Sequence, residues 1–273
     1  YIPALGTVNK NKKTCGITGK IRGGGRRFVA DATKLITLPG QPLAYWLSEK
    51  FISIFNNKTL AEYADARIGM VTGDNERFLR RWSEVDYTKS YYTATDLIQA
   101  VYTGKKWFPL QKGGGKRYWY GNLEYVVNYE RDGYELKFCN SIAGRVRSHN
   151  YNGSQAFQPG ITWNSIGTSD IICRISDKGF IYDAGGPLCT INNRDYTYYF
   201  LGLLTSCVAA EIFKSINPTI NYTPGTLLSL PVVQVESEQK ESIDELVGSC
   251  ISKSKQEWDS FEESWDFKKH PLI

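Results

Sequence analysis

Hydrophobic residues repeat at helical spacing in two long stretches of the chain. Residues 43–55, LAYWLSEKFISIF, follow Pro42, which favours the start of a helix, and they predict a helix. The strongly apolar run at residues 196–216 follows Asn193 and Asp195, either of which is a good helix cap. This run predicts one largely buried helix.

A third helical pattern lies near the end of the sequence, over residues 238–254, where the apolar residues share one side and predict an amphipathic helix. The apolar side consists of Ile243, Leu246, Val247 and Cys250. The next segment, WDSFEESWDFKKHPLI, is aromatic and acidic. We expect it to dock in extended form onto another part of the molecule.

The middle of the chain contains short apolar runs between turn residues, which indicate strands. A brief strand is predicted at residues 68–71, before the turn Thr72-Gly73-Asp74-Asn75. Further strands are predicted at residues 123–129, 160–165, 171–175 and 179–182. Because helices and strands do not alternate regularly, the predicted fold class is α+β. We expect short mixed strands with flanking helices, the buried helix and the C-terminal amphipathic helix.

Two polar stretches predict loops. Residues 1–40 alternate basic residues with glycine, and residues 141–158 are rich in Gly and Asn. A loop as long as the second one is often functional in a compact domain. We therefore divide the chain into a basic linker at 1–40, a central domain at 41–235, and a helix with a docking tail at 236–273.

Charge is unevenly distributed, although the net charge is only +5. Residues 1–30 contain seven Lys or Arg and no acidic residue, and residues 101–147 contain nine against four. Residues 236–266 contain three Lys against ten Asp or Glu. Such segregation indicates a basic face that meets an anion and an acidic face turned away from it. Solvated loops and a solvated helix would give the same pattern.

The cysteine pattern argues against a zinc site, because no CxxC pair occurs and both histidines lie far from any pair of cysteines. A chain of 273 residues can bury a core without disulfides, so reduced thiols in a cytoplasmic protein are the simpler expectation. We find no signal peptide and no apolar run long enough to span a bilayer. The single cysteines are Cys15, Cys139, Cys173, Cys189, Cys207 and Cys250.

Two glycine runs, at residues 23–25 and 113–115, invite comparison with phosphate-binding loops. Neither has the Walker or the dinucleotide-binding spacing. Close approach of the second run to phosphate, beside Lys112, Lys116 and Arg117, remains one interpretation. A tight turn that happens to be basic is the other.

No catalytic or metal-binding residues are predicted. A Ser-His-Asp set would need His149, in the polar loop, or His270, near the end of the sequence. The triplet Asn217-Pro218-Thr219 superficially resembles the Asn-Pro-Pro-aromatic motif of amino-methyltransferases, but it lacks the second proline and the aromatic residue. We interpret this triplet as the end of a helix.

The turn at Thr72, Gly73 and Asn75 has a structural interpretation, because Gly adopts positive φ and the two polar side chains can close onto the backbone. Arg77 follows in the same run of cations. Aromatic residues flank Lys116 and Arg117, and stacking roles are open to them, although burial is the stronger expectation for Trp107.

Several of these segments resemble, in the same order, the target-recognition region of the adenine-specific DNA methyltransferases of BREX phage-exclusion systems, the PglX type. The resemblance covers roughly residues 39–273, and the turn also resembles TaqI-like specificity domains. The resembling segments are GQPLAYWLSEK, GMVTGDNERFLRRWSEVDY, KKWFPLQKGGGKRYWYGNLEYVVNYERDG, FQPGITWNSI, KGFIYDAGG, LGLLTSCVAAEIFKSINPTINY and WDSFEESWDFKKHPL.

The resemblance implies a sequence-specific DNA-recognition module of a larger S-adenosylmethionine-dependent adenine DNA methyltransferase, acting in phage defence or restriction–modification. The family's S-adenosylmethionine loop and Asn-Pro-Pro-aromatic motif are not in this sequence, so we expect no activity and no cofactor in this stretch alone. Expected partners are double-stranded DNA, the methyltransferase domain of the same parent chain and other defence proteins, with no membrane. The alternative is a protein-interaction module that docks onto the methyltransferase domain or another defence component.

The candidate DNA-binding residues fall into two sets. Phosphate contacts set orientation, whereas side chains of a loop read base edges. The phosphate candidates are Arg77, Lys112, Lys116 and Arg117. The base-reading candidates in the polar loop are Arg145, Arg147, His149, Asn150, Asn152 and Gln155.

Overall fold

The computed structural model describes residues 16–17, 30–31, 38–40, 42, 46–138, 144–167, 170–217, 219–270 and 272. Most of the predicted basic linker, the glycine run at 23–25, Cys15 and Cys139 therefore lie outside the described residues. Within the linker, β1 (Gly16–Ile17) pairs antiparallel with β2 (Ala30–Asp31).

A four-stranded sheet, with the order β3-β10-β7-β8, forms the first half of the fold, and neighbouring strands are antiparallel. Buried residues of neighbouring strands face one another in this sheet: Cys189 of β10 lies opposite Ala66 of β3 and Ile161 of β7. The strands are β3 (Ala64–Arg67), β7 (Gly160–Trp163), β8 (Cys173–Ser176) and β10 (Leu188–Ile191).

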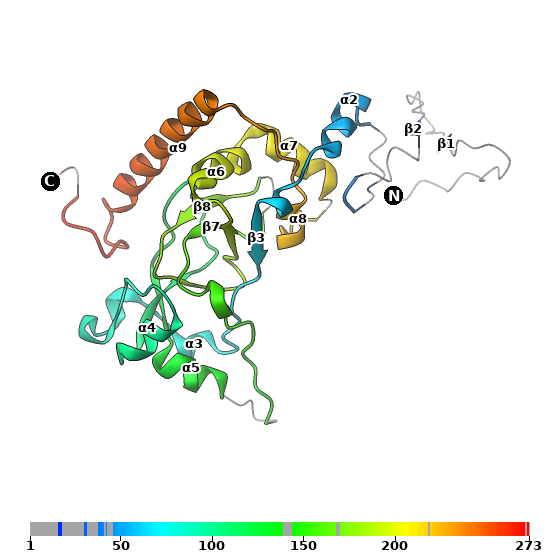
Figure 1. The fold of residues 1–273 in the computed structure, drawn as a ribbon. Coiled ribbons are helices and arrows are strands. Elements are labelled where there is room, and N and C mark those ends of the chain that lie inside the picture. Colours follow the sequence, from blue (N-terminus) through cyan, green and yellow to red (C-terminus); the bar gives the residue numbers. More distant parts are fainter. Residues whose placement is uncertain are drawn as a thin grey trace, which may run out of the picture.

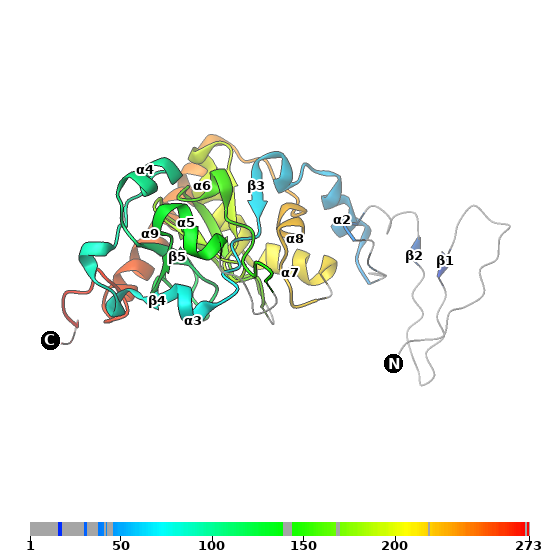
Figure 2. The same cartoon turned by 90° about the horizontal axis from the view of Figure 1, so that it is seen from below.

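Helices cover this sheet and complete the first core, in which Trp163, Phe200 and Phe213 are buried. Figures 1 and 2 show α7 and α8 lying between α2 and the first sheet. The helices are α2 (Glu49–Ile52), α6 (Thr197–Thr205), α7 (Cys207–Ile216), α8 (Pro224–Leu228) and α9 (Ser237–Trp258).

A second four-stranded sheet, with the order β4-β6-β5-β9, has its own core around Phe78, Phe108 and Leu136. Only the β5–β9 pair in it is parallel. Its helices gather at the end of the molecule opposite α6 and α9 (Figure 1). The elements are α3 (Asn75–Phe78), β4 (Leu79–Arg81), α4 (Leu97–Tyr102), β5 (Trp107–Gln111), β6 (Tyr125–Asn128), α5 (Glu130–Lys137) and β9 (Ile181–Tyr182).

Short 3₁₀ turns occur at Ser53–Asn56, Leu60–Glu62, Trp82–Glu84, Tyr87–Lys89, Gly153–Gln155 and Arg194–Tyr196. The predicted α+β class is confirmed. The helix predicted at residues 43–55 is short, because α2 covers only Glu49–Ile52 before a 3₁₀ turn, and residues 43–45 are outside the described part.

The apolar run at 196–216 forms two helices rather than the single helix that we predicted. They meet at Ser206, whose backbone is extended, with φ −72° and ψ 153°, and the chain bends by 66°. The Ser206 hydroxyl donates to the carbonyl of Leu203 at 2.7 Å and accepts from the amide of Ala209 at 3.1 Å. It thus closes one helix and caps the next.

Among the described residues, no single helix is both long and apolar enough to cross a bilayer. The bent pair Arg194–Thr205 and Cys207–Ile216 meets those criteria together, by length and composition only. Its apolar side chains, including Leu204 and Ile212, are buried against the first sheet. Such burial is typical of core helices.

The long helix α9 packs on α6 through one turn-spaced row, Ile243, Val247 and Ile251. Leu246, which we predicted on the apolar side, is 66 % exposed because contact is limited to this row. At the end of the helix Trp258 is buried with Tyr120 in a small third core. The following segment docks there as well, through residues such as Trp265.

The strand prediction was correct for residues within 123–182 and incomplete elsewhere. The strand expected at 68–71 lies earlier, as β3, and Met70 and Val71 instead form isolated bridges to Asp183 and His149. We did not predict β4, β5 and β10 as strands. Leu79–Arg81 is too charged to stand out as a strand, and it is paired with β6 by long-range contacts.

The two sheets join where glycines let backbones touch. A Cβ on Gly69 would lie 2.3 Å from the carbonyl oxygen of Asp183, and one on Gly113 would lie 2.1 Å from that of Gly185. Real Cβ atoms do not approach so closely, so these positions need glycine. The contacts bring the segments that follow β3, β5 and β9 to one place.

The glycine run 113–115 offers a matched test of this junction. Gly113→Ala is expected to lower the free energy of unfolding by about 1–3 kcal/mol, because its Cβ would overlap the backbone of Gly185. Gly115→Ala is expected to change it by less than about 0.5 kcal/mol, because the nearest atom lies 3.8 Å away. Urea unfolding of both variants measures the difference, and equal effects would contradict the contact.

Candidate functional site

The turn at Thr72–Asn75 is fixed by local hydrogen bonds. Gly73 has φ +73°, the Thr72 hydroxyl bonds the Asn75 side-chain oxygen, and Asp74 caps α3 by accepting from the amide of Arg77 at 3.1 Å. A Cβ on Gly73 would lie 2.6 Å from the Cβ of Arg147. The polar loop therefore packs directly on this turn.

Backbone bonds attach the polar loop to the same turn. The amide of Val71 donates to the His149 carbonyl at 2.9 Å, and the amide of His149 donates to the Val71 carbonyl at 3.0 Å. On its other side the loop is attached to α5, since the Ser148 hydroxyl donates to the Leu136 carbonyl at 2.5 Å. The loop backbone is therefore held on two sides.

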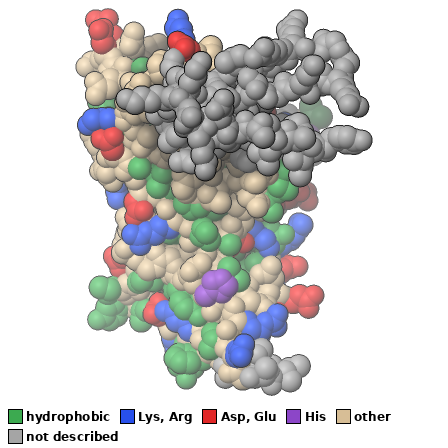
Figure 3. All heavy atoms as spheres, turned by 90° about the vertical axis from the view of Figure 1, so that its right-hand side faces the viewer, with side chains coloured by type: hydrophobic (Ala, Val, Ile, Leu, Met, Phe, Trp, Pro, Cys, Tyr) green, Lys and Arg blue, Asp and Glu red, His purple; other side chains and the backbone are tan. Residues whose placement is uncertain are grey.

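Four base-reading candidates extend from this anchored backbone with exposed side chains. They are Arg145, Arg147, His149 and Asn150. Figure 3 shows one face of the molecule, in whose lower part Lys and Arg side chains gather beside and below a histidine. An open cavity of about 510 Å³ lies at the turn, and Arg147 and Asp183 belong to its lining.

The other two base-reading candidates are buried and bound by protein partners. The Asn152 side chain donates to the Tyr182 carbonyl at 3.0 Å and accepts from the Tyr182 amide at 2.8 Å. The Gln155 side chain donates to Asp65 at 2.9 Å and accepts from the Tyr182 hydroxyl at 2.8 Å. Both amides hold the loop base to β9, so neither faces the surface.

Lys112 belongs to the same region as the turn, because it lies near Asp183, and its ammonium stands 4.7 Å from the ring centre of Tyr125. Asp183 is a site residue that the sequence did not single out. Its Oδ1 accepts from the amides of Gly185 at 2.8 Å and Gly186 at 2.9 Å. The pattern Asp-x-Gly-Gly was the available signal.

The remaining phosphate candidates differ in exposure and in their contacts with other protein groups. Lys116 is exposed and has no ion-pair partner among the described residues. Arg117 is half-buried, forms an ion pair with Glu257 and lies 5.0 Å from the ring centre of Trp258. Arg77 is exposed, with its guanidinium 5.2 Å from the ring centre of Phe78. The acidic helix α9 thus engages part of the basic stretch.

A row of buried side chains supports the glycine loop, residues 112–117, from inside. Asn122 donates to the Gly115 carbonyl at 3.0 Å, and Asn164 donates to the Gly114 carbonyl at 2.9 Å. Arg174, which is fully buried, donates to the Arg117 carbonyl at 3.1 Å and to Asn164 at 2.8 Å. Sequence analysis missed all three; the loop carbonyls that Asn164 and Arg174 bind lie 50 and 57 residues away in the chain.

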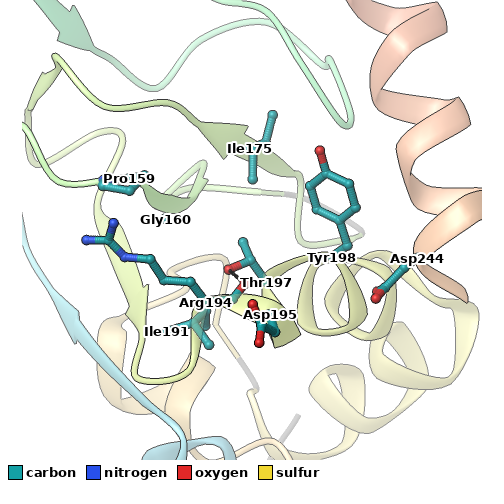
Figure 4. Close-up of a pocket in the computed structure, with 9 residues that line it drawn as sticks. All are labelled: Pro159, Gly160, Ile175, Ile191, Arg194, Asp195, Thr197, Tyr198 and Asp244. Atoms are coloured by element: carbon teal, nitrogen blue, oxygen red, sulfur yellow. Dashed lines mark hydrogen bonds between the residues drawn. The ribbon is translucent and has the colours of Figure 1, made fainter. Parts of the chain in front are cut away.

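A second cavity, of about 310 Å³, lies by α6 and α9 (Figure 4). Its polar residues bind protein groups: Arg194 donates to Gln158 at 3.1 Å, and Thr197 donates to the Arg194 carbonyl at 2.7 Å. Asp244 pairs with Lys240 at 2.5 Å. Nothing in its described lining forms a nucleophile with a base.

The described residues include no group of three or more His, Cys, Asp or Glu that could hold a metal ion. Asn217, in the triplet that resembles a methyltransferase motif, closes a turn: its side chain donates to the Asn221 carbonyl at 3.0 Å and accepts from the Thr219 hydroxyl at 2.9 Å. Pro218 lies outside the described residues.

Comparison with known proteins gives two similar curated sequences. The chain is 35 % identical over 244 residues to the adenine-specific methyltransferase PglX of Lacticaseibacillus casei (strain Zhang). This match covers 88 % of the chain and 20 % of PglX. It is also 35 % identical over 240 residues to the adenine-specific methyltransferase BrxX of Escherichia coli O9:H4 (strain HS). That match covers 86 % of this chain and 18 % of BrxX. The chain thus spans about a fifth of these relatives.

The fold is similar to part of MmeI, a type IIL restriction-modification enzyme solved in complex with DNA. The TM-score is 0.52 at 11 % identity, over 96 % of this chain and 37 % of that one. No family model matches the sequence. The resemblance to PglX-type methyltransferases that the sequence motifs predicted is confirmed.

Burial raises the pKa of Asp183 above its ordinary value of 3.8, although three glycine amides, those of Gly185, Gly186 and Gly113, and Lys112 oppose the rise. Because the pKa of Asp183 is raised in the folded state, the protonated carboxyl stabilises the folded chain at pH values below 3.8. This stabilisation is lost as the pH rises through the raised pKa of the folded state. Asp183→Asn keeps an oxygen for the glycine amides. The free energy of unfolding of this variant, relative to the original chain, is expected to increase as the pH rises from about 4 to neutral. Urea unfolding at a series of pH values measures it; a constant difference would contradict the assignment.

Proposed function

We propose, from the match to about a fifth of two adenine-specific methyltransferases, that this chain is the DNA target-recognition module of a larger enzyme of that kind. The parent would transfer a methyl group from S-adenosylmethionine to adenine, in phage defence or restriction–modification. The S-adenosylmethionine site belongs to the parent's methyltransferase domain, and we assign no catalytic residue to this module. We place the parent in the cytoplasm, where its DNA substrate is found.

The observation that carries this proposal is the packing of the polar loop on the Thr72–Asn75 turn. Gly73 and Val71 hold the backbone of residues 147–149, while the side chains of Arg147 and His149 extend outward. A reader of DNA needs this combination, because base edges are recognised by side chains held at fixed positions. The DNA complex of MmeI, whose fold is similar, supports a DNA partner.

Within the module, four side chains are assigned to base edges. Arg145 and Arg147 are suited to the two acceptors of guanine, and Asn150 to the donor and acceptor of adenine. His149 lies between them. Asn152 and Gln155 are not assigned, because their buried amides hold the loop base.

Phosphate contacts are assigned to Lys112, Lys116 and Arg77, which precede the polar loop in the sequence and are at least partly exposed. Arg117 is assigned to the interior, because Glu257 and Trp258 engage its guanidinium. Phosphate binding by lysine is independent of base sequence and releases counterions, so it falls steeply with salt.

A protein-docking role is the second candidate, and an apolar patch on α4 and α5 favours it. Large apolar side chains are exposed there, with Tyr102 86 % and Phe138 63 % accessible. Contiguous exposed patches of this kind mark interaction sites more often than chance. The patch consists of Ile98, Val101, Tyr102, Tyr134 and Phe138.

Binding of duplex DNA is expected to weaken as salt increases, and Lys116→Ala is expected to lower the log–log slope by about 1. The control is Lys214→Ala on α7, where the lysine pairs with Glu211 at 2.8 Å. Gel-shift titrations at four salt concentrations measure both slopes. An unchanged slope and affinity for Lys116→Ala would remove the phosphate assignment.

In the intact parent enzyme, Arg147→Ala is expected to relax the recognised sequence at one position. The lost discrimination is about 1–3 kcal/mol, the usual value for one bidentate contact. Sequencing that maps methylated adenines measures it, with Arg194→Ala beside the second cavity as the control. Unaltered specificity would assign base reading to residues other than Arg147.

The docking role is tested by Tyr102→Ser. If this substitution impaired methylation by the parent while Arg147→Ala did not, protein docking would be favoured.

A further inference from the structure

The glycine loop, residues 112–117, presents an unusual arrangement of its backbone. Three of its carbonyls, those of Gly114, Gly115 and Arg117, accept hydrogen bonds from buried side chains of the interior. In a trans peptide the C=O and the next N–H point in opposite directions. The amides that follow the first two carbonyls, those of Gly115 and Lys116, therefore point away from the interior.

These two amides have no hydrogen-bond acceptor among the described residues. Both residues are exposed, and the Lys116 ammonium extends from the same place. Successive outward N–H groups form a concavity that binds anions. The glycines also leave the backbone uncovered, so an oxyanion can approach it closely.

A buried cation beneath the loop is a second and independent indication. The Arg174 side chain is 0 % exposed, its Nε has no hydrogen-bond partner, and no described carboxylate forms an ion pair with it. Burial lowers the pKa of this guanidinium to about 10, so it is charged at neutral pH. A charge in the interior is weakly screened, and its field favours an anion at the loop above it.

We propose that Arg174, Asn164 and Asn122 are positioning residues, which hold the loop so that the amides of Gly115 and Lys116 and the Lys116 ammonium bind one phosphate of the DNA backbone. This inference rests on the proposed DNA-binding function and deepens it. Arg174 itself does not touch the phosphate. It acts through the Arg117 carbonyl and through Asn164.

The direct test observes the two amides. In the chain labelled with ¹⁵N-glycine and ¹⁵N-lysine, addition of a short duplex is expected to move the amide proton signals of Gly115 and Lys116 downfield. Gly115→Ala and Lys116→Arg identify the signals, and Gly225 and Lys214, on α8 and α7, are the controls. Duplex binding without these shifts would overturn the proposal. The titration uses the original chain, so its result does not depend on how a variant folds.

Asn164→Asp tests the positioning role. The carboxylate keeps the acceptor for Arg174 but loses the donor to the Gly114 carbonyl. We expect a folded variant whose duplex affinity falls about tenfold, with the salt slope unchanged because no surface charge is lost. The downfield shifts should disappear. The control is Thr162→Val. Thr162 lies opposite Arg174 in the β7–β8 pair, and its buried hydroxyl has no hydrogen-bond partner, so this variant should bind duplex DNA with unchanged affinity.

Titration with inorganic phosphate keeps this proposal separate from the proposed function. Shifts of both amides with phosphate, but no binding of any duplex, would support the anion site and refute the DNA-recognition role. The absence of shifts with either probe would overturn the anion site. Affinity and amide shifts of Asn164→Asp equal to those of the original chain would overturn the positioning role of Asn164.

Discussion

The structure depends on the close backbone contact where the two sheets join. Gly69 touches Asp183, and Gly113 touches Gly185, at distances that no side chain could occupy. Each sheet has a separate core, so this junction determines how the surface segments of one lie relative to those of the other. The turn, the polar loop and the start of the glycine loop all attach to it.

The sequence was sufficient for properties that local physics determines. Apolar periodicity located the buried helical region and α9, and Gly73 signalled a turn. Properties that depend on distant partners were not predictable. Gln155 reads as a surface residue, yet its partner Asp65 lies 90 residues earlier. Arg174 reads as a surface cation, yet it is buried and donates a hydrogen bond to the carbonyl of Arg117, 57 residues earlier.

Electrostatics divides the basic stretch between structure and surface. We expected the acidic C-terminal region to turn away from the cations, but Glu257 pairs with Arg117. That pair joins α9 to the glycine loop, and Trp258 completes the contact. The neighbouring Lys116 remains exposed. Arg117 therefore fixes the loop to the fold, and Lys116, the residue before it, is exposed to solvent or a ligand.

The anchoring of the polar loop has an evolutionary consequence. Its bonds to Val71 use only backbone atoms, and its contact with Gly73 uses the backbone and Cβ of residue 147, which every residue except glycine possesses. The outer side-chain atoms at 147, 149 and 150 take no part in these contacts with Val71 and Gly73. Substitutions there can accumulate at little cost in stability, so new binding preferences can arise on an unchanged scaffold.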